Sequence, residues 1–173
     1  MSSRVPNSPT KRPKLVIAAS SIQGMGVHVE EAAEPGTPLF AVRGRPHTED
    51  YDERFDKGSH WFSLGTRKWI EPGPRTYARF LNHSCQPTAV WADDRWVTAR
   101  VRIPAGGEIA IDYGTIELDP YWRMACSCGA PTCRRTVVPF YLEPSRVRRR
   151  LEPLAPAFLR NCLDDCLAIT AQR

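Results

Sequence analysis

The stretch Arg79-Phe80-Leu81-Asn82-His83-Ser84-Cys85-Gln86-Pro87 places polar side chains between two turn regions. A short polar run that ends in proline is more often a loop than a core element. The adjacent His83 and Ser84 do not indicate a hydrolase, because neighbours in sequence rarely reach one another productively. The sequence also lacks a GxSxG elbow and a convincing third member of a triad. The side chain of this stretch with the clearest chemical use is Cys85.

A second cysteine-rich stretch lies downstream, at Cys126-Ser127-Cys128-Gly129-Ala130-Pro131-Thr132-Cys133. Two thiolates one residue apart do not easily form a disulfide with each other, but they can bind one tetrahedral metal where the chain turns. Three cysteines need a fourth ligand to close a structural zinc site, and Cys85 is the best candidate, with Cys162 or Cys166 as the fallback. The alternative is a set of buried free cysteines, which a loop containing glycine and proline fits poorly.

Composition limits the classes to which the protein can belong. The 173 residues fit one domain, and 42% hydrophobic and 25% charged residues are ordinary for a folded soluble protein. We find no apolar run long enough to cross a membrane and no apolar segment of a secretory signal at the N-terminus. Six cysteines without an export signal favour reduced thiols or metal ligands over disulfides. The net charge of +5 favours anionic partners without naming one.

Short apolar runs between turn residues predict many short strands, and 16 prolines and 11 glycines keep the elements short. We expect strands at residues 15–19, 27–29, 39–42, 61–64, 68–70, 89–91, 96–101 and 108–113. Residues 61–70 and 89–101 are each typical of a hairpin. Residues 43–59 are polar and rich in turn formers, so we expect a loop or a short helix there. Residues 1–14 predict a flexible tail.

The C-terminal part changes to a helical periodicity. Between residues 145 and 169, apolar side chains recur at spacings of three and four, the stripe of an amphipathic helix. We expect Pro153 and Pro156 to split this stripe into two helices. Cys162 and Cys166 lie four apart on the stripe, where cysteine behaves as a small hydrophobic residue. Core packing is therefore favoured over a second metal site.

Four motifs in order give the sequence a family resemblance. Gly24-Met25-Gly26 precedes residues 79–85, and Glu108-Ile109-Ala110-Ile111-Asp112-Tyr113-Gly114 precedes the CxCx4C array. Over residues 15–135 this order resembles SET-domain lysine methyltransferases with a post-SET zinc loop. The resemblance implies a mostly β fold with α-helix, in which small curved sheets, a C-terminal pseudoknot and a helical tail occur. The expected parts are a basic tail at 1–14, a SET domain at 15–118, a post-SET zinc loop at 119–138 and a helical extension at 139–173.

The resemblance also implies roles for single residues. The cofactor of the family is S-adenosylmethionine, held largely by backbone groups of the glycine motif and of the asparagine–histidine pair. Carried to this sequence, the cofactor-binding residues are Gly24, Met25, Gly26, Arg79, Asn82, His83 and Tyr113. The catalytic residue is Tyr113, whose hydroxyl aligns the substrate amine more than it acts as a base. The structural zinc ligands are Cys85, Cys126, Cys128 and Cys133.

Four more side chains are implicated by the same resemblance. Trp61 and Phe62 are expected as walls of the channel for the substrate lysine, with ordinary core packing the alternative for at least one of them. Trp122 either covers the adenine or pins the zinc loop to the body. Ile111 stands where the family often has Phe or Tyr, and it carries no hydroxyl to anchor a water. We therefore expect more than one methyl group to be added.

The predicted function is S-adenosylmethionine-dependent transfer of methyl groups to the ε-amine of lysine in a protein, such as a histone or another basic protein. Two alternatives stay open: a catalytically inactive SET-like interaction module stabilised by zinc, and methylation of a peptide or a small-molecule amine. We expect no membrane contact. Direct nucleic-acid binding is not expected either, because the basic charge is spread along the chain. The expected location is cytoplasmic, or nuclear for a eukaryotic source.

Overall fold

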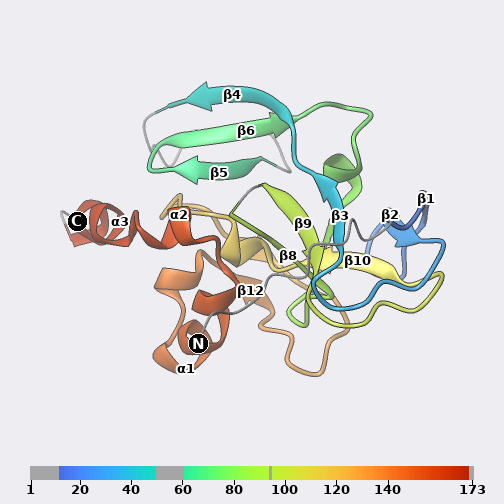
Figure 1. Ribbon diagram of the computed structural model, residues 1–173. Helices are drawn as coiled ribbons and strands as arrows, with labels where there is room; N and C mark the ends of the chain where they lie inside the picture. The colour runs from blue at the N-terminus through green and yellow to red at the C-terminus, as the bar shows by residue number, and fades with distance from the viewer. Residues whose placement is uncertain (1–11, 50–60, 94, 172–173) are drawn as a thin grey trace, which may run out of the picture.

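Four small sheets and a helical C-terminal segment make up the structure, a computed structural model that describes residues 12–49, 61–93 and 95–171 (Figure 1). The first sheet contains, in spatial order, β1 (Leu15–Ala19), β2 (Met25–Val29), β10 (Glu108–Ile111) and β7 (Asn82–His83). The second contains β3 (Pro38–Ala41), β9 (Trp96–Ala99) and β8 (Ala89–Trp91). The third contains β4 (Gly44–Thr48), β6 (Lys68–Pro72) and β5 (Phe62–Gly65). The fourth pairs β11 (Met124–Ala125) with β12 (Thr136–Val137) around the cysteine-rich loop.

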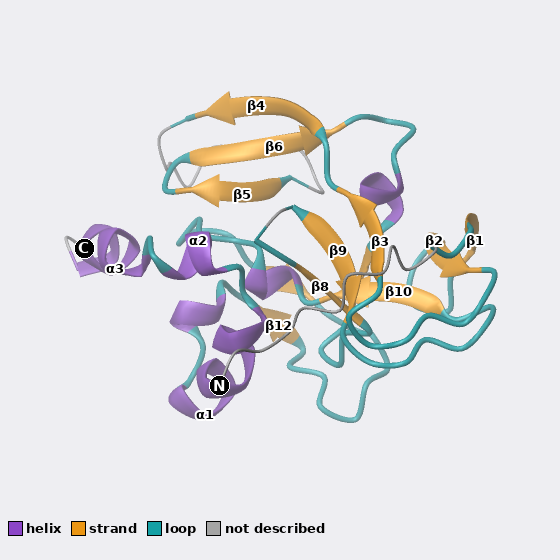
Figure 2. Cartoon of the chain, viewed as in Figure 1, coloured by secondary structure: helices purple, strands orange, loops and turns teal. Residues whose placement is uncertain are grey.

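The helices are short, and α1, α2 and α3 gather at the end of the molecule away from β1 and β2 (Figure 2). The α-helices are α1 (Ser145–Leu151), α2 (Ala157–Arg160) and α3 (Leu163–Ala171). The 3-10 helices are η1 (Tyr77–Phe80), η2 (Tyr113–Thr115), η3 (Phe140–Leu142) and η4 (Glu152–Leu154). In the described part of the chain, none of these helices has the length and apolar character needed to span a membrane.

The predicted proline breaks in the C-terminal segment are confirmed, but the expectation of two helices is wrong. Helix α1 ends before Pro153 and α2 begins after Pro156, and a further break separates α2 from α3. Cys166 is fully buried in the main core, and Cys162 packs against that core. Both cysteines thus serve as the small hydrophobic residues that the stripe predicts.

The helical extension docks on the strands through aromatic contacts. The ring of Trp91 on β8 lies 5.1 Å from that of Phe62 on β5 and 5.4 Å from that of Phe158 on α2. Both contacts are edge-to-face, the arrangement that aromatic quadrupoles favour. Phe62 and Trp91 are almost fully buried, and each burial of this kind contributes about 2 to 3 kcal/mol. The extension is therefore part of the folded body.

The predicted strands and both hairpins are confirmed within a few residues, but two expectations fail. Residues 44–48 form the strand β4, where we expected a loop or a short helix; residues 50–60 lie outside the described part. Among the described residues β4 pairs with β6 alone, so its polar side chains other than His47 stay exposed and Pro46 is tolerated at the sheet edge. The supposed loop at 79–87 contains β7, a buried strand that runs parallel to β10. The overall prediction of a mostly β fold with short helices is confirmed.

Candidate active site and metal centre

A cavity of about 900 Å³ lies where β2, η1, β7, η2 and the cysteine-rich loop meet. Its lining includes five of the residues that the sequence assigns to the cofactor: Met25, Arg79, Asn82, His83 and Tyr113. The volume falls in the ~300–1,000 Å³ range typical of small-molecule sites. Chain segments far apart in sequence are thus brought to one concave site.

The side chain of Asn82 hydrogen-bonds the turn that precedes β2 and so joins that turn to the strand β7. Its side-chain Nδ2 lies 3.1 Å from the carbonyl oxygens of both Gln23 and Met25, and 2.8 Å from Oε1 of Glu108. The Ser20 hydroxyl contacts both the amide of Asn82, at 3.0 Å, and the carboxylate of Glu108, at 2.8 Å. Because Asn82 is 9% exposed, these contacts also satisfy a nearly buried amide. The side chain of Asn82 therefore holds a cavity wall in place.

The two glycines beside Met25 shape the turn and do not belong to the cavity lining described here. Gly24 has a φ of +53°, which favours glycine. A Cβ at Gly26 would lie 2.3 Å from Oε1 of Glu108, so a side chain there would displace that carboxylate. Sequence reasoning missed Glu108, whose only signal is a carboxylate at the start of an otherwise apolar strand.

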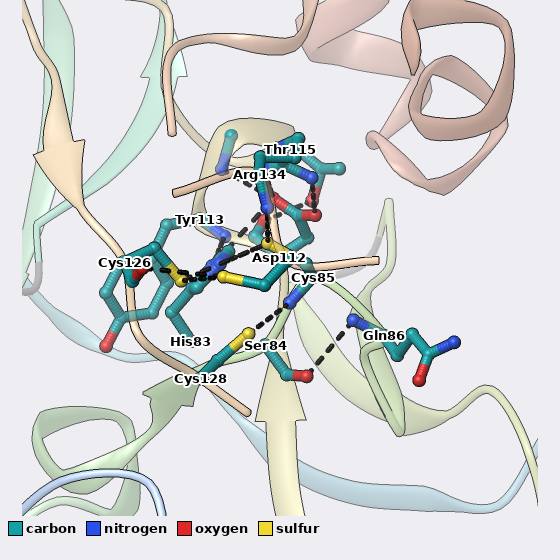
Figure 3. Close-up of polar contacts among 12 residues, drawn as sticks. His83, Ser84, Cys85, Gln86, Asp112, Tyr113, Thr115, Cys126, Cys128 and Arg134 are labelled. Atoms are coloured by element: carbon teal, nitrogen blue, oxygen red, sulfur yellow. Dashed lines mark hydrogen bonds and ion pairs between the residues drawn. The ribbon is translucent and has the colours of Figure 1, made fainter. Parts of the chain in front are cut away.

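Tyr113 presents a neutral hydroxyl at the cavity. The hydroxyl donates a 2.5 Å hydrogen bond to the carbonyl of Leu81, and the backbone N–H donates to Nδ1 of His83 at 3.1 Å. Burial, together with the charge of Glu108, raises the pKa of Tyr113 well above its usual value. The ring points away from the cysteine sulfurs (Figure 3). The hydroxyl therefore stays protonated and can act as an oriented hydrogen-bonding group.

Aromatic side chains complete the walls. Trp61 lines the cavity and stacks on His47 with ring centroids 4.2 Å apart, and Nε2 of His47 lies 2.8 Å from a carboxylate oxygen of Glu71. Phe62 lines the cavity and also belongs to the core. Trp122 lines the cavity and packs against the cysteine cluster. Trp122 thus both attaches the cysteine loop to the body and faces the cavity.

Cys85, Cys126 and Cys128, three of the four predicted zinc ligands, lie close together beside this cavity (Figure 3), and Cys133 packs against the same cluster. The sulfur of Cys126 lies 4.0 Å from that of Cys85 and 3.7 Å from that of Cys133. The sulfur of Cys128 accepts the backbone N–H of Cys85 at 3.4 Å. Four sulfurs at about 2.3 Å from a tetrahedral zinc lie about 3.8 Å from one another, and these two sulfur–sulfur distances are close to that value. The group of donor atoms that lies mutually within 4.8 Å contains Cys85, Cys126 and Cys128, so Cys133 stays a predicted fourth ligand.

The protonation of these thiols differs with their surroundings. Burial raises the pKa of Cys85 to about 11 and drives that of Cys126 higher still. At Cys128 burial acts in the same direction, but hydrogen bonds from the backbone at Cys85 and Ala130 and from neighbouring thiols outweigh it and lower the pKa to about 7. A bound cation would favour the thiolate at every position.

His83 also reaches the cysteines, and its hydrogen bonds decide its role. Its ring nitrogens and the sulfurs of Cys85, Cys126 and Cys128 offer donor atoms that lie within 4.8 Å of one another. Because Nδ1 accepts the N–H of Tyr113, the proton resides on Nε2, which faces the sulfur of Cys85 at 3.3 Å. Burial lowers the pKa of His83 to about 4, so the ring is neutral at ordinary pH. His83 therefore suits a hydrogen bond to a metal-bound thiolate better than metal ligation.

The segment that supplies the glycine turn, the Asn82–His83 pair and Tyr113 also decides the family. The SET domain family matches residues 24–114. This chain belongs to the SET-domain family. The resemblance stated from the four motifs is thereby confirmed, and the cysteine cluster lies just after the matched segment, where the sequence predicts a post-SET loop.

Named relatives agree with this placement. The chain is 31% identical over 141 residues to "Histone-lysine N-methyltransferase set-2" of Caenorhabditis elegans, covering 71% of this chain and 9% of the relative. It is 29% identical over 139 residues to "Histone-lysine N-methyltransferase trr" of Drosophila melanogaster, covering 72% of this chain and 6% of that relative. It therefore spans less than a tenth of each of these relatives.

A solved structure has the same fold. KRYPTONITE in complex with mCHH DNA, H3(1-15) peptide and SAH matches with a TM-score of 0.57 and 26% identity, over 73% of this chain and 30% of that chain. The SET fold of the present chain is therefore established from sequence and structure alike.

Proposed function

We propose that this SET domain transfers methyl groups from S-adenosylmethionine to the ε-amine of lysine in a protein substrate. The observation that carries the proposal is a single cavity lined by Met25, Asn82, His83 and the neutral hydroxyl of Tyr113. The relatives named as histone-lysine N-methyltransferases and the neighbour solved with SAH and an H3 peptide support it.

The cavity residues suit such a cofactor. When bound, S-adenosylmethionine supplies a methyl group activated by a sulfonium charge. Met25 and Trp122 offer apolar surface against which the cofactor can pack, while backbone groups of Asn82 and His83 on β7 offer it polar partners. The hydrogen bond from the side chain of Asn82 to the carbonyl of Met25 keeps the Met25 wall and the β7 wall of the cavity at a fixed separation. Pre-organisation of this kind lowers the entropic cost of ligand binding.

The residues around Tyr113 suit a lysine amine as the nucleophile. A free lysine has a pKa near 10.4, so its amine has to lose a proton before it can attack. The apolar walls formed by Trp61 and Phe62 disfavour the charged form and exclude water. The hydroxyl of Tyr113 donates its proton to the carbonyl of Leu81 at 2.5 Å, so the hydroxyl oxygen and that carbonyl offer two acceptors for the N–H groups of the amine and orient its lone pair.

The substrate class proposed is a basic protein such as a histone. A nuclear location accords with relatives named for histones, whereas the cytoplasmic location expected above has no support from them. The expectation that the protein makes no direct contact with nucleic acid stays a prediction, since the solved neighbour was crystallised with DNA.

Replacing Asn82 with Ala is expected to weaken S-adenosylmethionine binding at least about tenfold, because the turn carrying Met25 loses its attachment to β7. Calorimetric titration of zinc-loaded protein measures this without any knowledge of the substrate. The matched control is Asn161→Ala, at an exposed asparagine after α2, which should bind the cofactor like the natural protein. Absence of binding by the folded natural protein would favour the interaction-module alternative.

The number of methyl groups added provides a second test. Ile111 is fully buried on β10 and does not line the cavity described above. Its place in the motif is where the family resemblance implies a group that holds a water near the amine, and it carries no hydroxyl. We therefore expect dimethyl or trimethyl lysine among the products. Mass spectrometry of a methylated histone over a time course distinguishes the product states, and a product that stops at monomethyl lysine would contradict this expectation.

A further inference from the structure

Arg134 follows the last predicted zinc ligand and carries a charge into the interior. Its side chain is 6% exposed, and its guanidinium contacts the carboxylate of Asp112 at two points, Nη1 to Oδ2 at 2.5 Å and Nη2 to Oδ1 at 2.7 Å. Its Nε lies 2.8 Å from a carboxylate oxygen of Glu143 as an ion pair without hydrogen-bond alignment. Buried ion pairs of this kind add little net stability over apolar packing, so positioning is the better explanation for this group.

The side chain and the backbone of Arg134 each hold one element of the site. The carboxylate of Asp112, which is 1% exposed, caps η2 by accepting the N–H of Gly114 at 3.0 Å. The backbone N–H of Arg134 donates to the sulfur of Cys85 at 3.4 Å. Gly114 is required here, since a Cβ would lie 2.6 Å from the carbonyl of Val138. The zinc loop and the turn that carries Tyr113 are therefore fitted closely together.

These contacts close a ring (Figure 3). The sulfur of Cys85 faces Nε2 of His83, whose Nδ1 accepts the N–H of Tyr113. Tyr113 is joined by a peptide bond to Asp112, which pairs with Arg134, and the N–H of Arg134 returns to Cys85. Two members, His83 and Tyr113, line the cavity, and one, Cys85, is a predicted metal ligand. Displacing any member disturbs the hydrogen bonds of its neighbours.

We infer that Arg134 is a positioning residue that couples the closed zinc loop to the cavity through Asp112, His83 and Tyr113. The inference rests on the proposed function only for the identity of the cavity's ligand. Arginine is needed because its planar fork matches both oxygens of Asp112, which the point charge of a lysine cannot do. The neighbouring Arg135 is exposed, so it serves as the matched control.

The test compares Arg134→Lys, Asp112→Asn and Arg135→Lys with the natural protein by three measurements. These are the rate of zinc release to a chromophoric chelator, the hydrogen exchange of the amides of Tyr113 and Gly114, and the affinity for S-adenosylmethionine by calorimetry. For Arg134→Lys we expect zinc release about tenfold faster, in line with the effect of outer partners on metal affinity. We also expect faster exchange at both amides and cofactor binding about tenfold weaker. Asp112→Asn should reproduce these changes, and Arg135→Lys should show none of them.

Two outcomes would overturn the inference. One is an Arg134→Lys protein with natural zinc release, amide exchange and cofactor affinity. The other is a lowered melting temperature with these three quantities unchanged well below the transition, which indicates a purely structural role. If the natural protein binds no S-adenosylmethionine, the proposed function fails, and zinc release with amide exchange still decides the role of Arg134.

Discussion

Tyr113→Phe is expected to lower the rate of methyl transfer by at least about 100-fold while cofactor affinity changes little. The variant keeps the ring and its packing but loses the hydroxyl that contacts the carbonyl of Leu81 and faces the cavity. A small loss of alignment between nucleophile and methyl group is enough for an effect of about this size. Transfer of labelled methyl to histone protein measures the rate, and calorimetry measures binding.

The control for this prediction is Tyr141→Phe. Its hydroxyl also donates to a backbone carbonyl, that of Leu118, at 2.9 Å in a buried position, but the residue does not line the cavity. Both variants should lose about 1 kcal/mol of stability from the missing hydrogen bond. Only Tyr113→Phe should lose activity. Equal activity of the two variants would remove Tyr113 from the catalytic role.

The pH dependence should reflect the substrate and not Tyr113. Because burial raises the pKa of Tyr113, its hydroxyl stays protonated across neutral and mildly alkaline pH. Methyl transfer should therefore rise with pH as more lysine becomes neutral, and ionisation of Tyr113 should not reverse the rise in this range.

Local sequence signals predicted most of the strands, because hairpins depend on neighbours in the chain. The pairs β5–β6 and β8–β9 fall where apolar alternation flanks a turn. Strand β7 could not be predicted in this way. Its partner β10 lies more than 20 residues away, and its polar side chains are buried only because distant groups satisfy them. Burial of polar residues is a tertiary property that periodicity does not encode.

The candidate site likewise has residues that local sequence predicts and contacts that only the fold reveals. The spacing of Cys126, Cys128 and Cys133 is local, so their convergence could be expected from sequence, and Cys85 followed from the need for a fourth ligand. The contacts of Asn82 with Glu108 and of Asp112 with Arg134 join residues 26 and 22 positions apart. The motifs that contain Asn82 and Asp112 do not indicate which distant residue each of them contacts. The roles of Glu108 and Asp112 in holding the site in place are therefore seen only in the folded structure.

Removal of the metal is expected to have the second large effect, the loss of cofactor binding. The cysteine-rich loop supplies one wall of the cavity through Trp122, Met124 and Cys126, and its own packing is a small cluster centred on the thiols. Besides the short pair β11–β12, the contacts that hold this loop closed are the ion pairs of Arg134 and those among the thiols. A structural zinc contributes on the order of 10 kcal/mol to the folding of such a loop, far more than so small an apolar cluster.

Cys126→Ser is the sharpest way to test this, because the sulfur of Cys126 contacts those of both Cys85 and Cys133. Loss of a ligand should reduce metal affinity by more than the ~10–100-fold typical of outer partners. Zinc content by mass spectrometry and S-adenosylmethionine affinity by calorimetry should fall together, as they should after chelation of the natural protein. Cys162→Ser is the control, since its sulfur donates a hydrogen bond to the carbonyl of Phe158 within the described residues and a hydroxyl can replace it. A chelated, folded protein that binds the cofactor normally would show that the loop closes without metal.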